Sequence, residues 1–409
     1  MRPQLLKGIR VVDLSMGWAG PMCTRQLADQ GAEVIKVESC QHFDWWRGWE
    51  ATAQFIADDG AEKAVAFNTM NRNKLAVTLD LTNETGKGLL KRLVATADIV
   101  VENYSGGVLP KLGLDWPVLS AVRPDLIMIS MPAFGANGPW REYRAYGSTV
   151  EHASGLPHLN GEADWPPTMH HVAYGDPIAG LNAAAAVLIA LRHKRRTGAG
   201  QFLDLSQAEC LLPLGVHGIL EQSVSGQPPP RMGNASRYCA PHGVYPCAGD
   251  DEWICIQVQD EAQWQRLQRL VGALLDEFGD LEARLERRGE LDACIATWTR
   301  DIAPDALMTS LQAAGVPAGV LRAAAFLTAD PHLAARGFWQ MIERAHVGLQ
   351  PNPAAPYRQG GAPYPIDTPA PTLGQHNRRV LVEVLGLTDV EIDALYAQKI
   401  IGERPEMRG

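Results

Sequence analysis

The 409-residue sequence predicts an α/β protein built on a mostly parallel β-sheet. In the first third of the chain, short apolar segments alternate with stretches of helical periodicity, which is the pattern of strand–helix–strand units. Buried strands are expected at residues 9–14, 33–37, 99–101 and 126–130, and helices at residues 22–30 and 85–96. In a sheet of this kind, ligand sites form in the loops that follow the carboxyl ends of the strands.

A longer helix is expected over residues 180–196, with a defined beginning and end. Asp176 and Pro177 stand where an N-cap and a first-turn residue are typical. The basic cluster at residues 192–196 suits the negative end of the helix dipole, and Gly198 follows as a stop signal.

A second, smaller α+β unit is expected after a change in composition. Residues 223–230 (SVSGQPPP) have the composition of a linker. Beyond them, residues 243–246 and 253–258 resemble strands and residues 261–274 a helix. A chain of 409 residues also exceeds what one compact core usually holds, so that more than one folding unit is expected.

The expected domain boundaries follow from these segments. Residues 1–222 should form the first part of a large domain, residues 223–325 the linker and the small domain, and residues 326–409 the return to the large domain. Within this last part, residues 351–371 are Pro-rich and read as extended connecting chain, and residues 388–397 close the protein with a helix.

Composition and charge exclude several kinds of partner. The net charge of −9 repels a phosphate backbone, so we expect no nucleic acid. The longest apolar run, residues 183–191, is far short of the roughly 20 residues that a membrane span needs. Residues 1–10 lack a signal-peptide core, so a cytoplasmic protein without a membrane partner is expected.

The seven cysteines form no CxxC pair, and no metal site is indicated.

Asp176 is the residue that chemistry singles out, and two interpretations compete for it. An aspartate at a helix start is often a purely structural cap. The same position also keeps a carboxylate ionised, because the helix dipole and amide donors favour its charged form. An ionised carboxylate in a semi-enclosed site can attack a thioester carbonyl, while neighbouring amides stabilise the oxyanion.

Histidines and tryptophans add further candidates. His152, His170 and His171 lie in the same region of the sequence, and each is either a general base or an ordinary loop histidine. The clustered Trp45, Trp46 and Trp49 form either a packed corner of the fold or an apolar wall beside a ligand.

A dozen short segments, in order along the chain, resemble one family. They include residues 6–14, 19–21, 27–38, 71–74, 98–103, 112–115, 175–176 with Gly180, 197–201, 240–245 and 331–338. This set resembles the CaiB/BaiF family of class III coenzyme A (CoA) transferases, which includes formyl-CoA transferase and carnitine CoA-transferase. The resemblance spans essentially the whole chain.

The resemblance implies a Rossmann-like large domain, an inserted small domain and two subunits that interlock as rings, so that a homodimer is expected. It places Asp176 on the catalytic nucleophile and makes acyl-CoA and a small carboxylic acid the substrates, with succinyl-CoA a plausible donor. The positions that match CoA-binding residues are Trp18, Lys74, Asn103, Tyr104, Lys111 and Arg144. Of these, Lys74, Lys111 and Arg144 are expected to contact phosphates.

Two other functions remain open. A 2-methylacyl-CoA racemase of the same fold pairs the aspartate with a histidine, but Tyr146 stands at that position, and its ordinary pKa of about 10 suits proton exchange poorly. His152 would have to serve instead. The chain could also be a non-catalytic subunit of a hetero-oligomeric transferase, which retention of Asp176 argues against.

Overall fold

The computed structural model describes residues 4–169 and 173–407. The chain forms two compact units: the larger comprises Met1–Leu156, Met169–Leu220 and Pro331–Gly409, and the smaller comprises Pro157–Thr168 and Glu221–Asp330. The segment Pro157–Thr168, which we expected in the large domain, groups with the smaller unit. There the Gly233 amide donates to the Gly161 carbonyl over 2.9 Å, and Arg231 donates to the Glu162 carbonyl.

The large unit contains a six-stranded sheet in which every neighbouring pair is parallel, so the predicted α/β class is confirmed. Its strands are β1 (Arg10–Asp13), β2 (Glu33–Glu38), β3 (Lys74–Thr78), β4 (Ile99–Glu102), β5 (Ile127–Ser130) and β6 (Gln201–Asp204). Their order is β3-β2-β1-β4-β5-β6, the order of Rossmann folds. The direction of winding reverses between β1 and β4, and ligands of such sheets bind at the carboxyl ends there.

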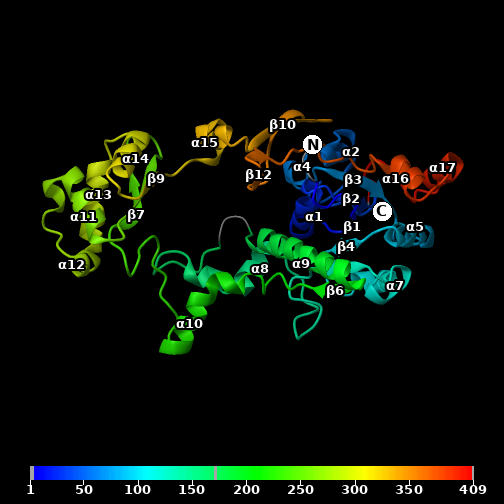
Figure 1. Cartoon of the computed structure of the whole chain (residues 1–409), viewed down its shortest axis with the longest axis horizontal. Coiled ribbons are helices and arrows are strands. Elements are labelled where there is room, and N and C mark those ends of the chain that lie inside the picture. Colours follow the sequence, from blue (N-terminus) through cyan, green and yellow to red (C-terminus); the bar gives the residue numbers. More distant parts are fainter. Residues whose placement is uncertain (1–3, 170–172, 408–409) are drawn as a thin grey trace. The chain divides into compact units, whose positions relative to one another are not determined.

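Helices cover both faces of this sheet (Figure 1). On one face, Val12, Ile35 and Val100 pack against α5 (Glu84–Ala95), α7 (Trp116–Val122), α16 (Asn377–Glu383) and α17 (Asp389–Ala397). On the other face, Val11 and Val34 pack against α1 (Ala19–Asp29) and α9 (Gly175–Thr197). The alternation of side chains along each strand therefore supplies two separate cores.

Helices α1 and α9 cross closely because a glycine stands at the crossing. A Cβ atom added to Gly180 would lie 2.5 Å from the Ala19 carbonyl oxygen and 2.7 Å from Met22 Cβ. The buried small residues Ala179 and Ala183 extend this contact along α9. The first turn of α1 is therefore held directly against the second turn of α9.

The remaining elements of the large unit are short. They are α2 (Ala53–Ala57), α3 (Gly60–Lys63), α4 (Val65–Met70), α6 (Val108–Leu112), α8 (Gly147–Ala153), η2 (Leu212–Gly215), α15 (Pro331–Ala335), β10 (Trp339–Arg344), β11 (Gly348–Pro353), β12 (Arg358–Gln359) and β13 (Ala362–Pro363). Two further elements, η1 (Leu156–Leu159) and α10 (Val216–Ser225), begin in this unit and continue into the smaller one. None of the helices in the described part of the chain combines the length and the apolar character that a bilayer crossing requires.

The smaller unit is an α+β structure around a three-stranded antiparallel sheet, β7 (His242–Pro246), β8 (Trp253–Gln257) and β9 (Ala318–Val320). Its helices are α11 (Glu261–Val271), η3 (Ala273–Leu275), α12 (Leu281–Glu286), α13 (Arg288–Thr299), α14 (Pro304–Ala313) and η4 (Ala324–Ala329). Trp264 fills its core, and the Arg284 guanidinium lies 4.5 Å from the centre of the Trp264 ring.

Candidate active site

Asp176 lies inside the first turn of α9 rather than at its cap. The helix begins at Gly175, so Asp176 is its second residue and Pro177 its third, and the N-cap is Tyr174, which makes no side-chain cap. Asp176 was predicted at the N-cap, but the N-cap lies two residues earlier, so that prediction is wrong. The buried Glu151 carboxylate instead accepts the Tyr174 amide over 2.9 Å and holds the chain where it enters the helix.

The N-termini of three helices meet at the Asp176 carboxylate. Besides α9 itself, the amides of Ala19 and Gly147, the first residues of α1 and α8, hydrogen-bond to it. Gly147 is needed for this approach, because a Cβ atom there would lie 1.9 Å from Asp176 Oδ2. Helix N-termini favour negative charge, so all three act to keep the Asp176 carboxylate ionised.

Burial nevertheless dominates the ionisation of Asp176. Desolvation raises its pKa from the usual 3.8 to about 6, and the Ala19 and Gly147 hydrogen bonds only partly offset that rise. The amide donors act in the direction expected from the sequence, but they lower the pKa by less than burial raises it. At neutral pH the group is still mostly a carboxylate, and a more basic carboxylate is a better nucleophile.

Asp176 opens into a cavity of about 430 Å³. The cavity brings together Asp176 and three of the predicted CoA-binding residues, Asn103, Tyr104 and Arg144. Its other lining residues are Met16, Trp45, Ser105, Ala133, Tyr143, Ala145, Tyr146, Thr149 and Gln207. Most of these residues follow the carboxyl ends of β1, β4 and β5, as the sequence predicted for a ligand site.

A second cavity, of about 480 Å³, continues from the first. The two share Met16, Trp45 and Tyr104, so these side chains lie between them. The second cavity lies at the carboxyl ends of β2 and β3 and is mostly apolar, with the exposed Lys111 at its edge. Together the cavities form an extended site, with Asp176 in the lining of the first cavity and Lys111 in the lining of the second.

Lys74 is not part of this extended site. Its ammonium lies 3.0 Å from Asp13 Oδ2, 2.7 Å from Thr24 Oγ1 and 2.8 Å from Asn71 Oδ1. Its side chain is 0% exposed and lines neither cavity, and burial lowers its pKa to about 8. This position does not suit the phosphate contact that we expected of Lys74, because its donors are already used inside the protein.

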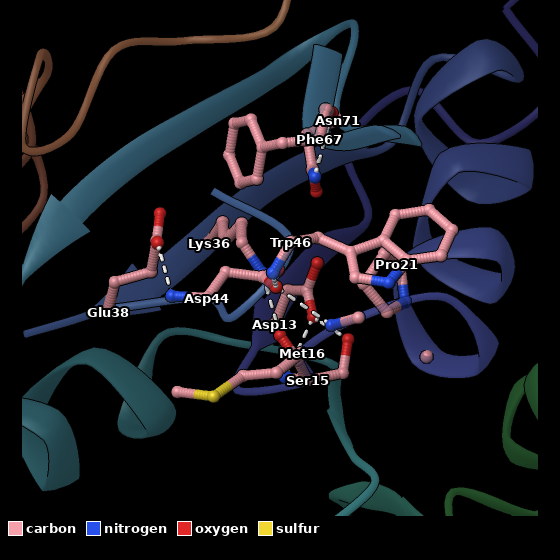
Figure 2. Close-up of polar contacts among 12 residues, drawn as sticks. Asp13, Ser15, Met16, Pro21, Lys36, Glu38, Asp44, Trp46, Phe67 and Asn71 are labelled. Atoms are coloured by element: carbon pink, nitrogen blue, oxygen red, sulfur yellow. Dashed lines mark hydrogen bonds and ion pairs between the residues drawn. The ribbon is translucent and has the colours of Figure 1, made fainter. Parts of the chain in front are cut away.

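The turn between β1 and α1, residues 14–18, is fixed by a buried polar network that surrounds it (Figure 2). Asp44 Oδ1 accepts the Gly17 and Trp46 amides over 2.8 and 2.9 Å. The Lys36 ammonium lies 2.9 Å from Asp44 Oδ2 and donates to the Ser15 carbonyl over 2.7 Å. Because this turn leads directly into Ala19, the network sets the position of the amide that faces Asp176.

Asn103 takes part in holding the same turn. Its side chain accepts the Met16 amide and donates to the Met16 carbonyl, both over 2.8 Å. Trp18, the N-cap of α1, lines neither cavity and packs against Trp46 with ring centres 5.4 Å apart. Of the predicted CoA-binding residues, Asn103 therefore both lines the first cavity and holds the turn, whereas Trp18 supports the turn without lining either cavity.

The tryptophan cluster is a packed corner and a cavity wall at once. Trp45 stacks on Trp49 with ring centres 4.9 Å apart, meets Tyr146 edge-on at 5.7 Å and lines both cavities. It also covers Gly17 so closely that a Cβ atom there would lie 2.0 Å from its ring. Trp45 is therefore part of a packed corner and of the wall of both cavities.

The histidine candidates gain no support as bases. The exposed His152 lines neither cavity, and its Nδ1 atom lies 2.7 Å from the Ser148 carbonyl oxygen. His170 and His171 lie outside the described residues. Tyr146, the residue that replaces the histidine of racemases, does line the cavity beside Asp176.

Comparisons with known proteins identify the family of the chain. Residues 6–377 match the family model described as CoA-transferase family III, and the chain belongs to that family. It is 35% identical to succinyl-CoA–D-citramalate CoA-transferase of Chloroflexus aurantiacus over 98% of both chains. It is 33% identical to succinate–glutarate CoA-transferase of Agrobacterium fabrum, over 93% of this chain and 95% of that one.

A solved structure extends the same relationship to three dimensions. The crystal structure of a CaiB/BaiF family protein from Brucella suis matches with a TM-score of 0.85 at 34% identity, covering 94% of this chain and all of that one. The resemblance noted in the sequence is therefore confirmed, and the protein is a class III CoA-transferase.

Proposed function

We propose that the protein transfers CoA from an acyl-CoA donor, with succinyl-CoA as a candidate, to a second carboxylic acid through covalent intermediates on Asp176. The observation that carries the proposal is the Asp176 carboxylate at the meeting point of three helix N-termini, open to a cavity of about 430 Å³. The succinyl donor is supported by two relatives, a succinyl-CoA–D-citramalate and a succinate–glutarate CoA-transferase.

The first half of the reaction charges Asp176 with CoA. The Asp176 carboxylate attacks the donor carbonyl, the carbon–sulfur bond breaks, and CoA leaves as a thiolate, so that a mixed anhydride of Asp176 and the donor acid remains. The thiolate then attacks the aspartyl carbonyl and displaces the donor acid as a carboxylate. The product is an aspartyl-CoA thioester, and no proton, metal or nucleotide is consumed.

The second half runs the same chemistry with the acceptor. The acceptor carboxylate attacks the aspartyl thioester and releases the thiolate, which then attacks the acceptor carbonyl and frees Asp176. Each attack on the aspartyl carbonyl puts negative charge on an oxygen of that group. The Ala19 and Gly147 amides, which already hydrogen-bond to the carboxylate, stand ready to stabilise this oxyanion.

CoA itself would lie along both cavities. The thioester belongs beside Asp176, and the pantetheine arm would pass Met16, Trp45 and Tyr104, which the cavities share. The nucleotide end would occupy the second cavity, where apolar walls suit adenine and Lys111 is available for a phosphate. This placement keeps Lys111 and Tyr104 as CoA-binding residues and assigns Lys74 a structural role.

We also propose that the protein is a homodimer, as the family resemblance implies. Exposed apolar side chains in the large unit support an interface there; they are Leu188, Ile189, Leu212, Leu214, Val216, Ile219 and Leu220. Light scattering of the purified protein should give twice the chain mass, and a monomeric mass at micromolar concentration would contradict the proposal.

Activity measurements test the proposed transfer. Purified protein is mixed with an acyl-CoA donor and a panel of carboxylic acids, and new acyl-CoA products are read by mass spectrometry. Asp176→Asn, which keeps the size of the side chain, should abolish every transfer that the wild type performs.

A second experiment separates CoA transfer from racemisation. When the protein is incubated with a 2-methylacyl-CoA in deuterated water, the substrate should gain no deuterium at its α-carbon. Deuterium at the α-carbon without any acid-to-acid transfer would establish a racemase instead.

A further inference from the structure

We propose that a phosphate-type dianion binds in a basic pocket of the large unit, away from the two cavities assigned to CoA. The pocket has a volume of about 180 Å³ and is lined by His332, Leu333, Arg336, Phe338, Ala354, Ala355, Pro356, Arg358 and Pro363. It shares no lining residue with either CoA cavity. The proposal therefore does not depend on the proposed CoA transfer.

The first observation is the charge of this basic pocket. Its described lining residues include Arg336, Arg358 and His332 but no acidic side chain. This contrasts with the whole chain, in which 46 acidic residues outnumber 37 lysines and arginines. A recess lined by charges of one sign concentrates ions of the opposite sign, so the ligand of this pocket is expected to be an anion.

The second observation is that the two arginines have no counter-ion. In the part of the chain that the structure describes, neither Arg336 nor Arg358 forms an ion pair, although both are half-buried. Their described hydrogen bonds go to backbone carbonyls: Arg336 Nη2 donates to Pro356 over 3.3 Å, and Arg358 Nη1 donates to Gly361 over 3.1 Å. A guanidinium has five N–H donors, so most donors of both groups remain for a ligand.

The third observation is that contacts between three segments bring the two arginines to one pocket. The hydrogen bond from Arg336 to Pro356 joins the segment after α15 to the segment that carries Arg358. On the β12–β13 pair, Arg358 lies opposite Pro363. A Cβ atom added to Gly337 would lie 3.3 Å from Pro363 Cγ, so the third segment returns to the first.

Further contacts fix the backbone on both sides of the pocket. The Ala354 amide donates to the Phe338 carbonyl over 2.6 Å. The Tyr357 hydroxyl accepts a hydrogen bond from Gln30 Nε2 over 3.0 Å and donates to Gln26 Oε1 over 3.1 Å, which attaches the segment before Arg358 to α1. A binding site whose supporting chain is already held in place loses little entropy when the ligand arrives.

Size and charge select phosphate as the ligand class. A water molecule occupies about 30 Å³ in the liquid, so a pocket of about 180 Å³ has room for a group of five heavy atoms such as phosphate. Two arginines supply two positive charges, which match a dianion, and guanidinium groups bind phosphate oxygens in pairs. The apolar side chains of Leu333 and Phe338 also line the pocket, so the phosphate group of a small monoester fits as well as the free ion.

Calorimetric titration of the protein with inorganic phosphate tests the proposal. The measurement is made at pH 8, where phosphate is mostly a dianion, with chloride holding the ionic strength constant. Arg336→Gln and Arg358→Gln should each weaken phosphate binding by roughly tenfold or more, as expected for loss of a charge-assisted contact. Phosphate should also raise the melting temperature of the wild type more than that of either variant, because it binds the folded state. The melting temperatures in chloride alone show whether each variant is folded.

Two control variants locate the bound anion. Arg266→Gln is the matched control, because Arg266 also donates to a backbone carbonyl, that of Gly315, and lines neither this pocket nor the CoA cavities. Lys111→Ala removes the lysine of the proposed CoA site. Both controls should bind phosphate as tightly as the wild type, and loss of binding in Lys111→Ala alone would place the anion in the CoA site and overturn the proposal.

Two further ligands define the anion. Methyl phosphate that binds more tightly than inorganic phosphate would identify a monoester as the source of the phosphate group, and equal or weaker binding would identify the free ion; either result supports the site. Succinate that binds as tightly as phosphate, with the same dependence on the two arginines, would overturn the assignment to phosphate. A wild type that binds no phosphate, or phosphate binding that both arginine variants retain in full, would overturn the proposal as a whole.

Discussion

The Asn103 side chain closes a reciprocal pair of hydrogen bonds with the backbone of Met16, each 2.8 Å long. This pair fixes the β1–α1 turn from the side of β4, while Asp44 and Lys36 fix it from the side of β2. This turn leads into α1, and the amide of Ala19, the first residue of that helix, hydrogen-bonds to Asp176. Asn103 is therefore a positioning residue in addition to lining the cavity.

Asn103→Ala should lower kcat roughly tenfold to a hundredfold, because a misplaced amide stabilises the oxyanion poorly. Loss of a hydrogen bond to the ionised carboxylate also raises its pKa, so the acid limb of the pH–rate profile should move to higher pH than in the wild type. Asn182→Ala, which removes an exposed amide bonded within α9, serves as the control. An Asn103→Ala enzyme with reduced kcat but an unmoved acid limb would show that Asn103 does not act through Asp176.

The wild-type pH–rate profile should itself report Asp176. Its pKa of about 6 means that the reactive carboxylate is lost as the pH falls through 6. Below that value kcat/KM should drop about tenfold per pH unit, as expected for one essential base. A profile that stays flat down to pH 4.5 would contradict the raised pKa.

Glu102 provides a separate pH-dependent effect, on stability. This buried carboxyl accepts the Tyr104 amide over 2.8 Å, and desolvation raises its pKa from 4.5 to about 7. A raised carboxyl pKa means that the folded state binds a proton more tightly than the unfolded state. The stability contributed by the protonated group is present below pH 4.5 and is lost as the pH rises to 7.

Glu102→Gln should therefore increase the free energy of unfolding by up to about 3 kcal/mol at pH 8 and by less than about 1 kcal/mol at pH 5. The glutamine carbonyl can still accept the Tyr104 amide. Denaturant titrations at the two pH values measure the difference, and equal gains at both would rule out an ionisable cause. The acid limb of activity near pH 6 should persist in this variant, because it belongs to Asp176.

Lys74 and Lys111 should behave oppositely on substitution. Lys74→Met leaves the buried Asp13 carboxylate without its ion-pair partner and should cost about 3–5 kcal/mol of stability. Lys111→Ala should leave stability unchanged and weaken CoA binding by about 1–3 kcal/mol, while Lys63→Ala, another exposed lysine outside the cavities, changes neither. A stable Lys74→Met protein that has lost only CoA affinity would restore the phosphate role expected from the sequence.

The sequence predicted the inner part of the sheet and missed its edges. Strands β1, β2, β4 and β5 have neighbours on both sides and carry adjacent β-branched or other apolar residues, so they were recognised. Strands β3 and β6 lie at the two edges, where each pairs on one side only. Their sequences, KLAVT and QFLD, carry charged and polar residues that gave no clear strand pattern.

The candidate site was predicted as a list of residues but not as an arrangement. The family resemblance gave Asp176 as the nucleophile and Tyr104 and Arg144 as CoA-binding residues, and the structure adds that all three line one cavity. The roles of Gly147 and Asp44 depend on contacts between segments far apart in the chain, which no local pattern reveals. One signal was available: Lys36, a charge within an otherwise apolar strand, indicates a buried ion pair.

Trapping the covalent intermediate tests the central claim most directly. The protein is mixed with an acyl-CoA donor, quenched with hydroxylamine, digested and examined by peptide mass spectrometry, with Asp176→Asn treated in parallel. An anhydride or thioester on the nucleophile predicts a hydroxamate at Asp176 that appears only when the donor is present and is absent from the variant. An unmodified Asp176 in protein that is actively transferring CoA, or a donor-dependent hydroxamate on a different carboxylate, would contradict the account.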